Sequence, residues 1–228
     1  MIDLVGIVQQ VSVVALPLVF AITLHEAAHG YVAWAMGDDT ARRLGRISLN
    51  PLRHVDPFGT IILPAMLMVM GSFLFGWAKP VPVNFAKLRS PRWGMVAVAA
   101  AGPGANILMA SMAIVLLPLV SGLPGAAVDW ARLNLVYAVQ INLLLAVFNM
   151  LPVPPLDGGR VLVGILPRPL AMRVARIENV GILILLAALV LLPILGRELG
   201  LPLDPFDWVI QPAVNALLEG LVAVFGGI

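Results

Sequence analysis

The stretch LVFAITLHEAAHGYVAWAM, residues 18–36, decides how the rest of this sequence is interpreted. It is almost entirely apolar, yet it contains His25, Glu26 and His29 within five residues. An apolar run of about 20 residues is what a helix needs to cross a lipid bilayer. Ionisable residues are costly inside such a run, so their presence indicates a functional site.

The spacing of these residues points to a metal. Two histidines at i and i+4 lie on one face of a helix, so both can reach the same ion. A glutamate beside the first histidine can take a proton from a metal-bound water. The alternative is a polar patch that packs against another helix, but the apolar surroundings argue against it. We therefore predict that His25 and His29 bind zinc.

Composition places the whole chain in the membrane class. The 228 residues are 61% hydrophobic and 11% charged, with a mean hydropathy of +1.00, whereas a globular domain carries roughly 25% charged residues. A net charge of +2 gives no argument for a nucleic-acid partner. The absence of cysteine excludes disulfides, thiolate zinc ligands and a cysteine nucleophile.

The predicted fold is an all-α polytopic membrane protein with about five to six membrane segments. We interpret the N-terminal segment as a retained span, and we expect the last segment either to cross the membrane or to lie on its surface. The catalytic membrane core is expected to occupy 1–176, and the C-terminal membrane segments 177–228. The predicted segments are 3–36, 58–76, 93–121, 131–151, 177–196 and 206–227.

Basic residues set the expected orientation. Twelve of the fourteen Lys and Arg lie in 37–57, 77–92 and 151–176, so the positive-inside rule puts these three stretches in the cytoplasm. The first two flank the segment 58–76, which must then re-enter the membrane; a full crossing against the charge rule is the alternative. The proline-rich piece 77–89 suggests a strand or a short β-hairpin.

A catalytic zinc site usually has three protein ligands and an open position. His54 lies in an arginine-rich stretch, where we expect it to be solvated or to face lipid headgroups. Asp157 is the better candidate, because prolines and glycines in NMLPVPPLDGGR, residues 149–160, break the helix and allow close approach. The alternative for Asp157 is an ordinary turn aspartate.

These two motifs together resemble the site-2 protease family of intramembrane zinc metalloproteases. That family pairs HExxH in one span with N-x-x-P-x-P-x-L-D-G in a later one, and residues 149–158 match every fixed position of the second motif. The resemblance covers roughly 5–165. It implies one Zn2+ per chain, with Glu26 as the catalytic glutamate and these ligands: His25, His29 and Asp157.

Weaker matches extend the resemblance. The run Gly102-Pro103-Gly104-Ala105-Asn106 resembles a GPxxN pattern of the family, where Gly102 can serve close packing and Asn106 can touch substrate or order the site. Asn149 is an oxyanion-stabilising candidate; an interhelical hydrogen bond is its alternative. The piece 77–89 matches the position of a family hairpin thought to meet substrate. PDZ and CBS domains of relatives have no counterpart, so we expect a minimal member.

The function implied by the resemblance is hydrolysis of peptide bonds in or near transmembrane segments. The expected partners are a single-span membrane protein substrate and the lipid bilayer, with no nucleic acid. We expect a prokaryotic plasma membrane and an active site nearer its cytoplasmic side. The alternatives are a zinc-binding membrane transporter and an inactive relative that binds membrane partners. Substrate identity and oligomeric state stay open.

Overall fold

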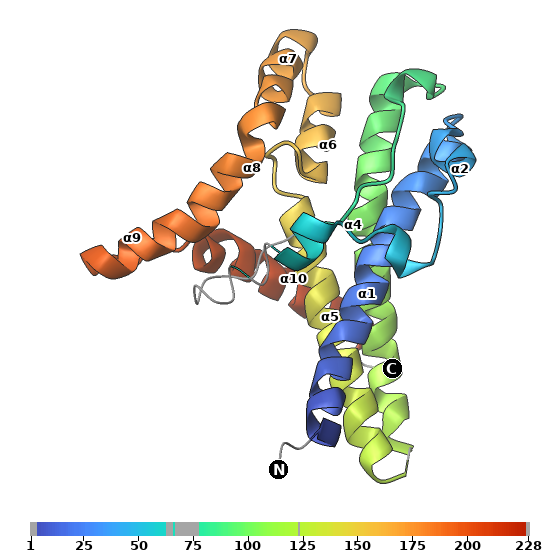
Figure 1. The fold of residues 1–228 in the computed structure, drawn as a ribbon, viewed down its shortest axis with the longest axis vertical. Coiled ribbons are helices and arrows are strands. Elements are labelled where there is room, and N and C mark those ends of the chain that lie inside the picture. The colour runs from blue at the N-terminus through green and yellow to red at the C-terminus, as the bar shows by residue number, and fades with distance from the viewer. Residues whose placement is uncertain (1–3, 63–65, 67–77, 123, 227–228) are drawn as a thin grey trace.

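The computed structural model describes residues 4–62, 66, 78–122 and 124–226, and these residues form helices and connecting segments without a β-strand (Figure 1). Short 3₁₀ or π turns lie at Pro51–Arg53, Pro57–Ile62, Phe85–Lys87, Leu117–Gly122, Ala187–Leu191 and Phe206–Ile210. The α-helices are α1 (Leu4–Ala35), α2 (Thr40–Arg43), α4 (Pro91–Leu116), α5 (Ala126–Asn149), α6 (Asp157–Ile165), α7 (Arg168–Arg176), α8 (Glu178–Leu186), α9 (Leu192–Leu199) and α10 (Gln211–Phe225).

Among the described residues, five helical stretches are long and apolar enough to cross a membrane. The all-α polytopic membrane fold is therefore confirmed, and the protein is an integral membrane protein. The last stretch qualifies by length and composition, although the sequence left its crossing open. The five stretches are Ser12–Ala35, Pro91–Gly122, Ala127–Asn149, Glu178–Leu199 and Phe206–Phe225.

Helices α1, α4 and α5 pack against one another as a bundle, and α6 lies against α4 (Figure 1). Small side chains let the helices approach closely. Ala110 and Ala113 of α4 are buried against Val139 and Leu143 of α5. Close backbone approach through small residues is a common way for helices to associate in lipid, where apolar surface alone gives little driving force.

The C-terminal helices attach to this bundle at fewer places. Residues Glu178–Leu199 form a long helical rod that slants away from the bundle (Figure 1). Gly181 of the rod touches the loop before α6, because a Cβ there would lie 1.6 Å from the Pro154 carbonyl oxygen. Helix α10 covers the α4–α5 contact with Val214 and Leu217, among other side chains.

The segment 78–84 is extended but forms no strand, so the hairpin expected within 77–89 is absent from its described part, 78–89. Pro80 and Pro82 lack backbone N–H groups and cannot donate to a strand ladder. The remaining donors bind other elements: Lys79 N donates to the His54 carbonyl at 2.8 Å. This bond joins the two flanks of 58–76, which re-entry requires. Residues 63–65 and 67–77 lie outside the described part, so re-entry stays a prediction.

Asp38 fastens the end of α1 to the same extended segment. Its carboxylate is fully buried and accepts hydrogen bonds from the backbone N–H groups of Thr40, at 3.0 Å, and Asn84, at 2.6 Å. Burial alone would raise the pKa of Asp38, but bonds from Thr40 and Asn84 hold it below its ordinary value. The Asp38 carboxylate is therefore ionised at neutral pH. The stability contributed by its hydrogen bonds is lost only as pH falls through the lowered pKa.

Candidate metal centre

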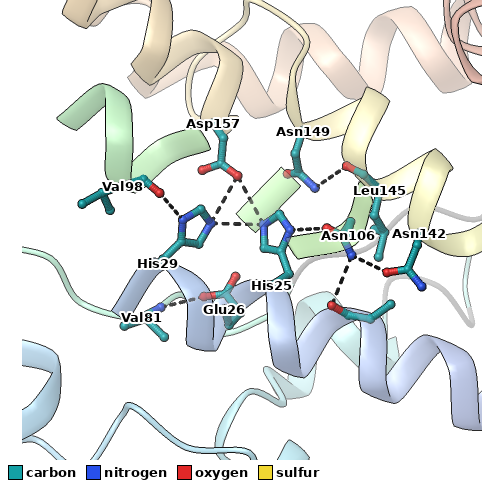
Figure 2. Close-up of polar contacts among 11 residues, drawn as sticks. His25, Glu26, His29, Val81, Val98, Asn106, Asn142, Leu145, Asn149 and Asp157 are labelled. Carbon is teal, nitrogen blue, oxygen red and sulfur yellow. Dashed lines mark hydrogen bonds and ion pairs between the residues drawn. The ribbon is translucent and has the colours of Figure 1, made fainter. Parts of the chain in front are cut away.

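Three side chains from two distant parts of the sequence converge in the middle of the bundle (Figure 2). His25 and His29 point from one face of α1, and Asp157 is the first residue of α6. The two Nε2 atoms lie 3.1 Å apart, and each lies 3.2 Å from Oδ2 of Asp157. All three residues are more than 90% buried. This is the one group of three potential metal ligands found among the described residues.

The outer ring nitrogens show where the protons are. Nδ1 of His29 lies 2.7 Å from the Val98 carbonyl, which can only accept, so Nδ1 carries the hydrogen. Nδ1 of His25 lies 2.5 Å from Oδ1 of Asn106 and donates to it. When the rings are neutral, both Nε2 atoms then carry lone pairs, which face each other and a carboxylate oxygen of Asp157. Such a convergence of electron pairs could hold a metal ion at its centre.

A zinc ion fits this donor set. The ligand atoms of a tetrahedral zinc with bonds of about 2.0–2.1 Å lie roughly 3.3–3.4 Å apart, close to the spacing of the three atoms here. Two imidazoles and one carboxylate also form the protein ligand set of known catalytic zinc sites. Gly102 of α4 leaves room beside the ligands, because a Cβ there would lie 2.5 Å from His29 Nε2 and 2.6 Å from His25 Nε2.

The loop before α6 delivers Asp157 to the histidines. Gly158 and Gly159 let the first turn of α6 fold back against this loop. A Cβ on Gly158 would lie 2.2 Å from the Met150 carbonyl oxygen, and one on Gly159 would lie 2.3 Å from Pro154 N. Side chains at these two positions would push α6 away, so the glycines after the aspartate are needed to place its carboxylate.

Glu26 lies beside these three side chains but is not part of the group that could hold a metal. Its Oε2 accepts a hydrogen bond of 2.8 Å from the backbone N–H of Val81 (Figure 2). Val81 stands between Pro80 and Pro82, so it holds the only backbone N–H group of these three residues, and that group binds Glu26. One carboxylate oxygen of Glu26 is thereby fixed by the extended segment, and Oε1 has no such bond among the described contacts.

The GPxxN residues lie on the metal side of α4. Gly102 faces the two ligand nitrogens, so its small size serves the centre itself as well as packing. Asn106 is 0% exposed and binds His25, Ala21 and Asn142 through its amide. Of the two roles considered for Asn106, contact with substrate and ordering of the site, its hydrogen bonds fit ordering.

Asn149 and His54 differ from their expected surroundings. Asn149 is half-buried at the end of α5, and its Nδ2 donates to the Leu145 carbonyl of its own helix at 2.9 Å, not to another helix. The prediction that His54 is solvated is wrong, because it is only 2% exposed and its Nε2 donates to the Ser48 carbonyl at 2.9 Å. Arg42, Arg43 and Arg53 of the same stretch are exposed, so the composition of the stretch does not reveal that His54 is buried.

Sequence reasoning missed three groups around the centre. These are the Val98 carbonyl, the Val81 N–H and the side chain of Asn142. The two backbone groups carry no residue-specific signal. Asn142 did offer one: it is a polar residue within an apolar span, and such residues commonly hydrogen-bond to a neighbouring helix.

Comparison with known proteins shows the family. The chain is 36% identical over 215 residues to YwhC of Bacillus subtilis, covering 92% of this chain and 90% of the relative. The chain belongs to peptidase family M50, the site-2 protease family. The model of peptidase family M50 matches residues 123–192, which include Asp157.

Other relatives agree with this assignment. Rip2 of Mycolicibacterium smegmatis is 32% identical over 141 residues, 60% of this chain and 51% of the relative. MJ0611 of Methanocaldococcus jannaschii is 40% identical over 65 residues, 28% of this chain and 31% of the relative. All three relatives bear the printed name "putative zinc metalloprotease". None of the solved structures matches the chain. Family membership makes this protein a zinc metalloprotease with Zn2+ as its cofactor.

Proposed function

We propose that this protein is an intramembrane endopeptidase that hydrolyses peptide bonds in or near the transmembrane segments of membrane proteins. The observation that carries the proposal is the convergence of His25, His29 and Asp157, with the Glu26 carboxylate beside them, inside a bundle of membrane-spanning helices. The assignment of one Zn2+ to these three ligands belongs to the proposal.

Bound zinc acts as a Lewis acid that makes water a nucleophile near neutral pH. Glu26 then serves as the general base: it accepts a proton from the water that attacks the scissile carbonyl carbon. Glu26 passes this proton to the leaving amide nitrogen as the C–N bond breaks, so the carboxylate is regenerated. The bond from Val81 N–H to Oε2 holds the Glu26 carboxylate in one orientation through both transfers.

Asn149 is the proposed donor to the oxyanion that develops on the carbonyl oxygen. It precedes Asp157 by eight residues, at the end of the helix that leads into the loop before α6. Its Nδ2 uses one hydrogen on Leu145, which leaves the second for a substrate oxygen. A donor of this kind is typically worth about 10²–10³ in kcat.

The depth of the site defines the substrate. His25 lies ten residues before the end of α1 at Ala35, hence about 15 Å along the helix. A transmembrane helix hides its carbonyls in its own hydrogen bonds, so a substrate segment must unwind locally before cleavage. The proposed substrate is a single-span membrane protein with helix-weakening residues in its span. The proposed location is a prokaryotic plasma membrane, with the site nearer the cytoplasmic face.

The test compares the wild-type chain with Glu26→Gln in proteoliposomes. The substrate is a single-span protein with Gly and Pro in its membrane segment, and zinc per chain is measured on the same samples. We expect about one zinc in each protein and cleavage by the wild type alone, because Glu26 is a base and not a ligand. Zinc transport across the vesicles without cleavage would favour the transporter. Zinc binding with neither cleavage nor transport would favour the inactive, partner-binding relative.

A further inference from the structure

The two histidines of the metal centre are oriented by different kinds of partner. His29 Nδ1 donates to a backbone carbonyl, that of Val98, which no side-chain substitution can remove. His25 Nδ1 donates instead to the side chain of Asn106 at 2.5 Å. The orientation of His25 therefore depends on which way the amide of Asn106 points.

A second asparagine fixes that amide. Asn106 Nδ2 donates to Oδ1 of Asn142 at 2.7 Å and to the Ala21 carbonyl at 3.3 Å (Figure 2). Both acceptors lie on the side of the amide away from His25, so Oδ1 of Asn106 must face the imidazole. A flipped Asn106 would set its oxygen against two other oxygens.

A backbone carbonyl fixes the orientation of Asn142, the first side chain in this series of hydrogen bonds. Asn142 Nδ2 donates to the Ala138 carbonyl at 2.8 Å, and this carbonyl can only accept. Oδ1 of Asn142 is thereby turned toward Asn106. The series of donors and acceptors from Ala138 to His25 has one consistent direction, which places the hydrogen of His25 on Nδ1 and the lone pair on Nε2.

Burial keeps the amide groups of Asn106 and Asn142 from reversing their hydrogen bonds. Asn106 is 0% exposed and Asn142 is 2% exposed, so water does not replace a lost partner. An unpaired amide in such surroundings is costly, and hydrogen-bonded chains in a low dielectric strengthen one another. His25, Asn106 and Asn142 come from α1, α4 and α5, respectively. Their series of hydrogen bonds therefore also connects the three bundle helices beside the metal centre.

We infer that Asn142, acting through Asn106, is a positioning residue that sets the tautomer and aim of His25 as a metal ligand. The inference rests on the proposed function in one respect, namely that His25 binds zinc. Outer partners of ligand histidines typically change metal affinity by about 10–100-fold when they are removed. Asn142 touches neither ligand atom, so its effect passes through Asn106.

The test measures zinc affinity of the full-length, detergent-purified chain by competition with a chelator. Asn142→Leu removes both hydrogen bonds, and we expect it to weaken zinc binding about 10–100-fold. Asn142→Asp, which keeps an acceptor oxygen for Asn106, should bind zinc more tightly than Asn142→Leu. Asn134→Leu is the matched control: Asn134 lies two turns earlier on α5 and makes the same bond to the carbonyl four residues back, that of Trp130. It should bind zinc like the wild type.

A second measurement uses the wild-type chain alone, so it decides the matter even where Asn142→Leu does not fold. Long-range 1H–15N correlation on zinc-loaded, 15N-histidine-labelled protein should show His25 protonated at Nδ1 and bound through Nε2. Zinc bound through Nδ1 of His25, or equal zinc affinity in Asn142→Leu and Asn134→Leu, would overturn the inference. A wild-type chain without zinc would overturn the proposed metal centre itself, which the competition assay distinguishes at once.

Discussion

The N-terminal span of the bundle and the C-terminal helix α10 have nearly the same hydropathy but very different surroundings. Over 18 residues of the span Ser12–Ala35 the mean hydropathy is 1.4 and 44% of the stretch is buried, whereas over 18 residues of Phe206–Phe225, which contains α10, the mean hydropathy is 1.5 and 6% is buried. Hydropathy therefore places both helices in the bilayer without saying which of them has protein around it.

Polar groups account for the difference. The bundle helices carry His25, Asn106 and Asn142, whose hydrogen bonds cross from helix to helix and fix the spacing of α1, α4 and α5. In contrast, α10 attaches through apolar side chains such as Val214 and Leu217, and much of its surface is exposed. We expect the bundle to be sensitive to the change of a single hydrogen bond, and the C-terminal helices to tolerate most substitutions except where Gly181 meets the loop before α6.

The largest effect is expected at Gly102 of α4. Gly102→Ala would set a methyl group 2.5–2.6 Å from both ligand nitrogens, so the imidazoles must swing away or the metal cannot enter. Zinc affinity should fall by more than the roughly 100-fold that loss of an outer partner can cost. Chelator competition measures this loss.

Gly104 is the matched control for that substitution. It lies on the same helix, and a Cβ there meets nothing within 4 Å among the described atoms. Gly104→Ala should keep wild-type zinc affinity, because the added methyl group has open space around it. Both substitutions gain the same helix propensity of about 1 kcal/mol, so a difference in zinc affinity between them reports the contact of residue 102 with the histidines. Equal zinc binding by the two variants would mean that α4 does not line the metal centre.

An intermediate effect is expected where the C-terminal rod touches the site. Gly181→Ala would place Cβ 1.6 Å from the Pro154 carbonyl oxygen, so α8 must move off the loop that leads to Asp157. Overpacking of this kind costs about 1–3 kcal/mol. Thermal unfolding in detergent should show the loss, whereas Gly220→Ala on α10, where a Cβ meets nothing within 4 Å, should be unchanged or more stable. Equal stability of the two variants would mean that α8 does not pack against the loop that leads to Asp157.

A smaller effect is expected at Arg46, which lies at the edge of the bundle. Its Nη2 donates to the carbonyls of Lys79, at 3.0 Å, and Pro80, at 3.3 Å. The Pro80–Val81 peptide is therefore held on both sides, by Arg46 at its carbonyl and by Glu26 at its N–H. Arg46→Ala should lower kcat about twofold to tenfold, as expected for one or two exposed hydrogen bonds, with zinc content unchanged.

The exposed Arg43 supplies the comparison, because its ion pair with Asp39 does not involve the 78–84 segment. Arg43→Ala should keep wild-type kcat in the same assay. If Arg46→Ala and Arg43→Ala behave alike, the extended segment does not position Glu26.

The sequence predicted the five apolar helical stretches and the three side chains that meet at the centre, whereas zinc binding by those side chains and the re-entry of 58–76 stay predictions. His25, Glu26 and His29 follow from spacing on one helix, and the later motif pointed to Asp157. Both signals are local patterns of residue types. The sequence could not show that Gly102 faces the two histidines or that His54 is buried. It also did not show that 151–176 contains two helices, α6 and α7. These features depend on which faces meet, and apolar helices with similar hydropathy do not encode that in a visible period.

The extended segment shows the same limit from the other side. Its prolines correctly indicated an irregular, extended backbone, but the pattern could not distinguish a hairpin from a segment whose N–H groups bind side chains. Val81 binds Glu26 and Asn84 binds Asp38, and both acceptors come from more than forty residues earlier. The division of the chain at residue 176 into a core and C-terminal segments stays a prediction.

X-ray absorption at the zinc K-edge of the purified wild-type chain can show whether His25, His29 and Asp157 hold the catalytic zinc. We expect two imidazole ligands per zinc, with oxygen ligands completing a first shell at about 2.0–2.2 Å, and loss of bound zinc in Asp157→Ala. A first shell with three imidazoles, which would have to include the buried His54, or with a single imidazole, would contradict this ligand assignment.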